Sequence, residues 1–136
     1  MSPILGLAHV GIAVRSLEAA TPVWRTLGFH HTDTVVLESM KLRIAFLRAG
    51  SSELELLEPT SEDSLVGRFL AKRGEGIHHL SFYVTDIEKA IAHAEKSGLA
   101  LVDRAIREGS HHTKIAFLSP QSLHGVLVEF CERREP

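Results

Sequence analysis

The sequence has 136 residues, of which 44% are apolar and 24% charged, and its formal net charge is −2. This is the composition of an ordinary soluble globular protein, without the positive charge that binding to nucleic acid or an anionic membrane requires. No segment has the apolar length of a membrane span, the N-terminus lacks the order of a signal peptide, and the single cysteine, Cys131, is typical of a reducing compartment. We therefore expect a cytoplasmic protein that has neither a nucleic-acid nor a membrane partner.

The first half of the chain predicts a strand, a helix and three further strands. Residues 4–15 alternate between two kinds of side chain, as in a strand whose two faces differ. A helix running to Leu27 follows, with Ser16 and Thr21 as alternative N-caps. Because Pro22 disrupts a helix interior, we expect either a late helix start or a kink there. Apolar and β-branched segments then predict three strands joined by hairpins, at residues 29–37, 41–48 and 53–58.

The second half predicts the same order of elements after a connecting helix at residues 61–73. A strand at residues 77–84 leads to a helix that Asp86 caps and Gly98 ends. The remaining strands are predicted at about residues 100–107, 113–118 and 126–131. We expect one domain over residues 1–136, built from a module at about 4–59, the connecting helix at about 61–73 and a module at about 76–132.

An internal repeat relates these two modules. The segment LAHVGIAV at residues 7–14 aligns with IHHLSFYV at 77–84, 70 positions later and without a gap. The sequence IAFL at residues 44–47 recurs at 115–118, and LELLE at 54–58 aligns with VEFCE at 128–132. Such self-similarity predicts a duplicated structural unit. The fold class is therefore α+β, with tandem βαβββ modules that form a curved mixed sheet.

The repeat aligns four residues in two pairs, His9 with His79 and Glu55 with Glu129. Each lies on the strand face opposite the apolar one, and a carboxylate in so apolar a strand is costly unless a cation compensates it. Equivalent placement in two modules would bring these side chains to a central metal site, where two nitrogens and two oxygens suit a divalent ion. Taken singly, a strand histidine is usually structural and a glutamate near a strand end is usually solvated, so it is the recurrence in both modules that favours metal binding.

The same alignment distinguishes the two neighbouring histidines of the second module. His79 aligns with His9, whereas His78 aligns with Ala8 and points to the opposite face. We therefore expect His79 to be the ligand and His78 to be a hydrogen-bonded residue behind it.

These features resemble the vicinal oxygen chelate superfamily. The resemblance covers about residues 5–132 and is carried by the duplicated βαβββ pattern, the strands HVGIAV and HHLSFYV, and the segment FLSPQSLHGVLVEFCE. Within the superfamily, ELELLEPTSEDSLVGRFLAKRGEGIHHLSFYVTDIEKAI resembles the methylmalonyl-CoA epimerases. By this resemblance the metal ligands are His9, Glu55, His79 and Glu129. It also implies one divalent ion per chain (Co²⁺, Zn²⁺, Mn²⁺ or Ni²⁺), an acyl-CoA substrate and a homodimer.

The activity that the resemblance implies is epimerisation of (2R)- and (2S)-methylmalonyl-CoA through an enolate chelated to the divalent metal. Inversion needs proton transfer on both faces of the substrate, for which we expect Glu55 and Glu129 to serve, with His112 as a weaker candidate. The chain departs from the family at Ile44, where some epimerases have a free carboxylate base. It also has His111-His112 and His124-Gly125 where they have Gly-Gly.

Alternatives within the same superfamily remain. A His-Glu-His-Glu set is also that of metal-dependent glyoxalase I, and epimerases often have Gln at the position of Glu55, so a glyoxalase-type isomerase is the main alternative. Non-catalytic ligand-binding members typically lack the four ligands. Iron-dependent oxygenases of this fold use a His-His-Glu triad, against which the fourth protein ligand argues.

Overall fold

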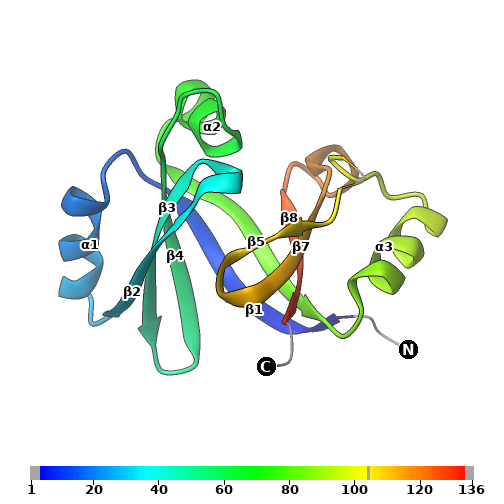
Figure 1. The fold of residues 1–136 in the computed structure, drawn as a ribbon, viewed down its shortest axis with the longest axis horizontal. Coiled ribbons are helices and arrows are strands. Elements are labelled where there is room, and N and C mark those ends of the chain that lie inside the picture. Colours follow the sequence, from blue (N-terminus) through cyan, green and yellow to red (C-terminus); the bar gives the residue numbers. More distant parts are fainter. Residues whose placement is uncertain (1–3, 104, 134–136) are drawn as a thin grey trace. The chain divides into compact units, whose positions relative to one another are not determined.

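The computed structural model describes residues 4–103 and 105–133, and over these residues it contains eight strands and three α-helices (Figure 1). The elements occur in the predicted order, a strand, a helix and three strands, twice, with a helix between the two sets. The α+β class and the tandem βαβββ modules are thereby confirmed. None of the described helices is long and apolar enough to cross a membrane.

Two compact units make up the described chain. Residues 9–78 form the N-terminal unit, and the C-terminal unit consists of the start of β1 up to Ala8 together with the chain from His79 onward. The boundaries fall inside strands β1 and β5, so each unit is described by itself below.

The N-terminal unit contains a mixed group of strands. Strands β2 and β3 pair antiparallel, as do β3 and β4, whereas β1 and β4 are parallel. The elements of this half are β1 (Ile4–Ala13), α1 (Leu17–Thr26), β2 (His30–Leu37), β3 (Leu42–Ala49), β4 (Ser52–Pro59) and α2 (Leu65–Arg73). All four strands agree with the predicted ranges to within one or two residues.

The C-terminal unit repeats this topology, because β5 and β8 are parallel while β7 pairs antiparallel with both β6 and β8. Its elements are β5 (Gly76–Val84), α3 (Ile87–Lys96), β6 (Arg107–Glu108), β7 (Thr113–Leu118) and β8 (Val128–Arg133). Short 3-10 turns occupy Glu38–Met40, Ser110–His112 and Pro120–Ser122.

The prediction of a regular strand over residues 100–107 is wrong. Leu101 makes only an isolated bridge to Leu118, and the regular strand β6 is two residues long. The Asp103 carboxylate accepts a hydrogen bond from the backbone N–H of Ala105, which is a turn interaction that competes with strand pairing. Arg104 lies outside the described residues.

Helix α1 begins at Ser16, whose side chain accepts a hydrogen bond from the N–H of Ala19, and not at Thr21. Pro22 therefore lies inside the helix, and the late start that the sequence suggested is wrong. A proline at this position leaves the carbonyl four residues earlier without its helical donor. The helix continues for only one further turn, and Gly28, with φ of 111°, follows it.

Helix α2 begins three residues later than the earliest capping serine would suggest. Ser61 starts a turn in which its hydroxyl accepts from the N–H of Asp63, and the actual N-cap is Ser64, which accepts from the N–H of Gly67. A Cβ atom on Gly67 would lie 2.5 Å from the carbonyl oxygen of Ser61. Only glycine therefore fits where α2 meets the turn before it.

The two faces of the N-terminal strands bury different helices. The face that includes Ile12 and Leu56 packs against α1, and the face that includes Ala13, Ile44 and Leu57 packs against α2. In the C-terminal unit the corresponding contact is between α3 and strands β7 and β8 (Figure 1). Side chains alternate along a strand, so Glu55 lies on the α2 face of β4, together with Leu57.

In each unit, a second repeated glutamate accepts a hydrogen bond from the first turn of the helix that follows the unit's first strand. The carboxylate of Glu58 accepts one hydrogen bond from the N–H of Leu17 at Oε2 and another from the guanidinium of Arg43 at Oε1. Glu132 accepts from the N–H of Ile87 and lies 3.9 Å from the ammonium of Lys114. In both units, therefore, a strand carboxylate caps the first turn of a helix and is paired with a cation.

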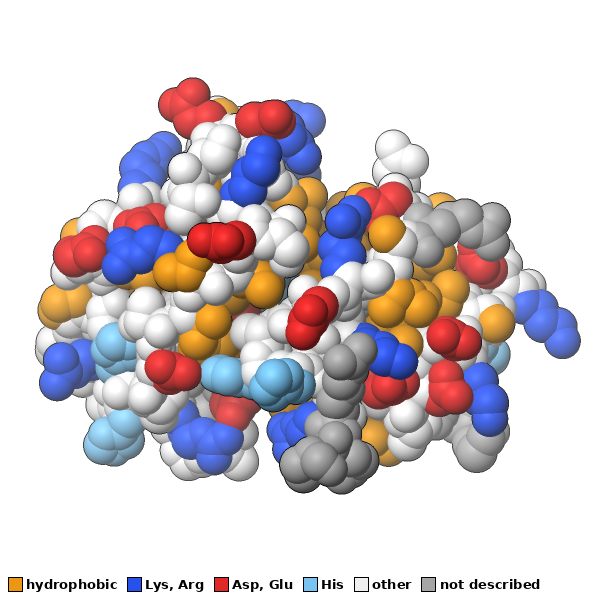
Figure 2. Space-filling view, viewed as in Figure 1, with side chains coloured by type: hydrophobic (Ala, Val, Ile, Leu, Met, Phe, Trp, Pro, Cys, Tyr) orange, Lys and Arg blue, Asp and Glu red, His pale blue; other side chains and the backbone are white. Residues whose placement is uncertain are grey.

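The surface carries both signs of charge. Figure 2 shows Lys and Arg side chains interspersed with Asp and Glu over the visible face. This pattern is consistent with the near-neutral net charge of −2.

Candidate metal centre

In the N-terminal unit, parallel pairing of β1 and β4 brings His9 and Glu55 together. Their strands are in register with Gly11 opposite Glu55. The Nδ1 atom of His9 lies 3.0 Å from Oε2 of Glu55, and both side chains are buried. Burial lowers the pKa of His9 to about 4, because desolvation penalises the imidazolium. The imidazole is thus neutral near pH 7, the form in which histidine binds a metal ion.

In the C-terminal unit, β5 and β8 place His79 and Glu129 in the corresponding arrangement. The Nε2 atom of His79 lies 3.8 Å from Oε2 of Glu129, and the two residues are only 5% exposed each. Burial raises the pKa of Glu129 to about 7, although a hydrogen bond from Ser81 acts in the opposite direction. A carboxylate this far from water is stabilised by a cation.

The chemistry of these donors fits a divalent ion. His9 of the N-terminal unit, and His79 and Glu129 of the C-terminal unit, are each buried and each offer one ligand atom. Glu55, the fourth predicted ligand, lies against His9. Imidazole nitrogens with carboxylate oxygens suit ions such as Zn²⁺ or Co²⁺.

His78 has different surroundings from His79. Its ring packs edge-on against Phe69 of α2, with 5.0 Å between ring centroids. Burial lowers its pKa to about 4, so it is neutral near pH 7. In the C-terminal unit the His79 ring instead packs edge-on against Phe117, which is in register with Glu129.

His112 lies next to the end of the β7–β8 strand pair that is distant from Glu129. It is exposed and immediately precedes Thr113, which pairs with Arg133, whereas Glu129 pairs with Phe117 four residues further along β7. Four strand residues correspond to about 13 Å. Glu129 and His112 are therefore separated along this ladder by more than the length of a histidine side chain.

The backbone is left-handed at two of the departures from the family pattern. His111, His112 and His124 have φ of 54°, 60° and 59°, and Gly125 has φ of 88°. Glycine adopts these angles without strain, and the family has Gly-Gly at both places. The third departure, Ile44, is 3% exposed and packs with Leu57 and α2, so a carboxylate there would be surrounded by apolar side chains.

Sequence analysis missed Ser81, which is wholly buried and donates a hydrogen bond of 2.6 Å from Oγ to Oε1 of Glu129. Two signals could have identified it. Ser81 has the same strand parity as His79, and it aligns with Gly11 in the repeat, which has no side chain to donate.

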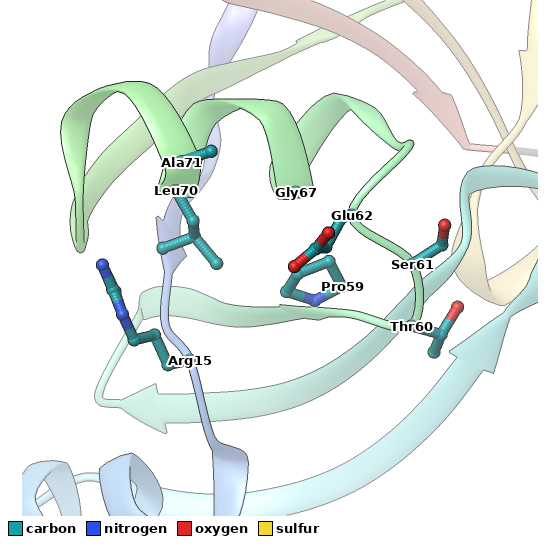
Figure 3. A pocket seen from close by; sticks show the side chains of 8 residues that line it. All are labelled: Arg15, Pro59, Thr60, Ser61, Glu62, Gly67, Leu70 and Ala71. Atoms are coloured by element: carbon teal, nitrogen blue, oxygen red, sulfur yellow. The ribbon is translucent and has the colours of Figure 1, made fainter.

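A separate cavity of about 500 Å³ lies in the N-terminal unit, between α2 and the ends of β1 and β4 (Figure 3). Arg15 lies at one end of it, and Glu62 and Pro59 lie below the start of α2. The lining residues are Arg15, Pro59, Thr60, Ser61, Glu62, Gly67, Leu70 and Ala71. None of the four predicted ligands is among them, so this cavity is distinct from the candidate metal centre.

Comparison with known proteins gives the family. Residues 8–117 match the model of the glyoxalase/bleomycin resistance protein/dioxygenase superfamily. The chain belongs to this superfamily. Its fold class, an α+β arrangement of mixed β-sheet in tandem βαβββ modules, is the one that this membership implies.

Several relatives that match most of the chain are epimerases. The mitochondrial methylmalonyl-CoA epimerase of Homo sapiens is 33% identical over 125 residues, which cover 90% of this chain and 71% of that protein. A structure of the Streptomyces coelicolor methylmalonyl-CoA epimerase in complex with 2-nitronate-propionyl-CoA is 38% identical, with a TM-score of 0.91 over 97% of this chain and 99% of that one. A methylmalonyl-CoA epimerase in complex with methylmalonyl-CoA and NH4+ is 39% identical, with a TM-score of 0.90 over 96% and 95% of the two chains.

Proposed function

We propose that this protein is a metal-dependent epimerase that interconverts (2R)- and (2S)-methylmalonyl-CoA. The observation that carries the proposal is the pair of equivalent, buried His–Glu contacts, His9 with Glu55 and His79 with Glu129. They occur in a chain that is similar over most of its length to epimerases of this substrate. A buried carboxylate is costly unless a cation compensates it, and here each of two such carboxylates lies next to a buried histidine.

The proposed ligand set is His9, Glu55, His79 and Glu129, which together would hold one divalent ion. When bound, such an ion acts as a Lewis acid that stabilises negative charge on an oxygen of the substrate. Co²⁺, Zn²⁺, Mn²⁺ and Ni²⁺ all accept these donors. Neutral imidazoles and ionised carboxylates are the required forms, and the burial of His9 keeps its ring neutral near pH 7.

The protein's own contribution to the chemistry would be proton transfer. Inverting the carbon between the thioester and the carboxylate requires removal of its proton from one side and return of a proton to the other. We assign these two tasks to Glu55 and Glu129, one serving each side. His112 remains a candidate only for a supporting role, because it lies far from Glu129 along β7 and β8.

A specific feature favours a second candidate, a glyoxalase-type isomerase acting on a thiol–aldehyde adduct. The chain has Glu55 where epimerases often have Gln, and four ligands of the His-Glu-His-Glu type match metal-dependent glyoxalase I. Proton transfer next to a bound carbonyl compound is common to both reactions, so the substrate distinguishes them.

The test uses the purified, metal-loaded protein with (2R)- or (2S)-methylmalonyl-CoA in deuterated water. We expect loss of optical purity together with deuterium incorporation at C2, detected by chiral analysis and mass spectrometry. Protein treated with a chelator should lose this activity, and each of the four ions should restore it to a different degree.

The matched variants are His79→Ala, which removes a proposed ligand, and His93→Ala, which removes an exposed histidine of α3. The first should lose both metal and activity and the second neither. Full activity in protein without detectable metal would refute the proposal. Turnover of a thiol–aldehyde adduct, with none of methylmalonyl-CoA, would establish the second candidate instead.

The homodimer, the cytoplasmic location, the single domain and the acyl-CoA substrate expected from the sequence stay predictions. Sedimentation of the purified chain tests the first of them directly.

A further inference from the structure

Ser81 is a buried polar residue for which the proposed mechanism has no use. It lies on β5 directly opposite Glu129 of β8, and its side chain is fully buried, with 0% exposure. Its Oγ donates to Oε1 of Glu129 over 2.6 Å. Hydrogen bonds from a hydroxyl to a carboxylate are short and strong, and this length is typical of them.

The two carboxylate oxygens of Glu129 have different neighbours. Oε1 accepts a hydrogen bond from the hydroxyl of Ser81. Oε2 lies 3.8 Å from Nε2 of His79. A carboxylate that is fixed through one oxygen presents the other in a defined direction. An ion that is bound next to His79 would thus meet Oε2, and the Glu129 carboxylate would act as a one-oxygen ligand.

The repeat shows that this arrangement is specific to one module. Gly11 occupies the register position opposite Glu55 that Ser81 occupies opposite Glu129. The strands and their parallel pairing are equivalent in the two units, but only the C-terminal unit has a hydroxyl at this position. Packing alone does not explain a serine there, because a fully buried hydroxyl is more costly than a methyl group unless its hydrogen bond is needed.

We propose that Ser81 is a positioning residue that holds the Glu129 carboxylate so that Oε2 alone is offered to the metal ion. This rests on the proposed metal-dependent function, since it concerns the same ligand. Hydrogen bonds to metal ligands orient them and tune the metal, and their loss typically lowers metal affinity by about 10- to 100-fold. We expect a loss of that size when the Ser81 hydroxyl is removed.

The test compares Ser81→Ala with Ser64→Ala by calorimetric titration of the metal-free, full-length protein with Co²⁺. Ser64 is the matched control, because it is also a buried serine whose hydroxyl accepts and donates hydrogen bonds, at the start of α2. Ser81→Ala should weaken Co²⁺ binding about 10- to 100-fold. Ser64→Ala should lower the thermal midpoint and leave the Co²⁺ affinity unchanged.

A second readout separates positioning from general stability. The visible absorption of bound Co²⁺ depends on the number and geometry of its ligands, so a carboxylate that is no longer fixed should change the spectrum of Ser81→Ala. Ser81→Thr retains the hydroxyl and should retain the parental spectrum. Parental affinity together with a parental spectrum in Ser81→Ala would overturn the proposal.

If Ser81→Ala does not fold, Ser81→Gly decides, because it removes the hydroxyl and reproduces the glycine found opposite Glu55. Reduced Co²⁺ affinity in that variant supports the proposal, and unchanged affinity overturns it. Both measurements are made without substrate. A failure here therefore leaves the epimerase proposal intact, and a protein that binds Co²⁺ as expected but does not epimerise would refute that proposal alone.

Discussion

At the scale of single residues, Glu55 is the site where ligation and proton transfer can be separated. Its Oε2 lies 3.0 Å from Nδ1 of His9. Glu55→Gln keeps an oxygen that can bind a metal ion but removes the capacity to accept a proton. We expect this variant to bind metal nearly as the parent does and to lose about 10²-fold or more in epimerisation rate, as for loss of a positioned base. Metal titration and a chiral assay measure the two effects.

Exchange of the α-hydrogen distinguishes the roles of the two carboxylates. In Glu55→Gln, deuterium exchange of one epimer should persist while inversion is lost, because only one side of the substrate is still served. Glu53→Gln is the control, since Glu53 is on the same strand but pairs with Arg48 at the surface. Parental epimerisation by Glu55→Gln would show that Glu55 is only a ligand, and His112 would then be the next residue to test.

The repeat accounts for which site residues could be predicted. His9, Glu55, His79 and Glu129 each have an equivalent in the other module, so alignment of the chain with itself singles them out. Ser81 aligns with Gly11, so the repeat does not pair it with a like residue, and its strand parity with His79 is a weaker signal. The 2.6 Å hydrogen bond to Glu129 is what shows its importance.

At the scale of elements, the carboxylates of Glu58 and Glu132 join each last strand to the start of a helix. Replacing either by Gln keeps the shape but removes the charge that interacts with the helix N-terminus and its cation. We expect Glu58→Gln and Glu132→Gln each to lower the free energy of unfolding by about 1 kcal/mol, since a hydrogen bond to a charged group becomes a neutral one. Denaturant titration measures this loss.

The same surface control, Glu53→Gln, should change the free energy of unfolding by less than about 0.5 kcal/mol, because exposed ion pairs contribute little. Equal effects of all three substitutions would contradict a capping role. The two cap variants should also resemble each other, since Glu58 and Glu132 make equivalent contacts with Leu17 and Ile87.

The elements themselves were predicted best where apolar segments are clearly separated by turn residues. Strands β1, β2, β3 and β4 lie in apolar or β-branched segments separated by turn residues and match the predicted ranges to within two residues. Residues 100–107 instead contain a local side-chain turn at Asp103 that pattern counting overlooks. The start of α2 was misplaced because several hydroxyl groups compete for the cap. Ser61 forms a preceding turn, and Ser64 caps the helix. Pro22 was predicted either to delay the start of α1 or to kink it, and the Ser16 cap, one of the two predicted caps, starts the helix before the proline.

At the scale of the whole molecule, two natural probes report on the two units separately. Trp24, the single tryptophan, belongs to the N-terminal unit, and Cys131, the single cysteine, is buried in the C-terminal unit. If the chain is one domain, as predicted, denaturant should unfold both units together. We expect tryptophan fluorescence and thiol labelling to give coincident midpoints, in metal-free and in metal-loaded protein.

Separate midpoints would show that the units unfold independently and would contradict the single-domain prediction. Saturating metal should shift both probes to higher denaturant, because an ion that binds only the folded state stabilises it by mass action. A shift confined to one probe would mean that one His–Glu pair binds the ion alone.

The likeness of the two His–Glu pairs has a consequence for the ancestry of the chain. A precursor with one module would possess one histidine and one glutamate of the proposed set, and a second copy of itself would have had to supply the other two. Its two glutamates would have been identical by symmetry. In a chain that carries both modules, a substitution beside one glutamate leaves the other unchanged. Ser81 and Gly11, which occupy equivalent register positions, differ in this way.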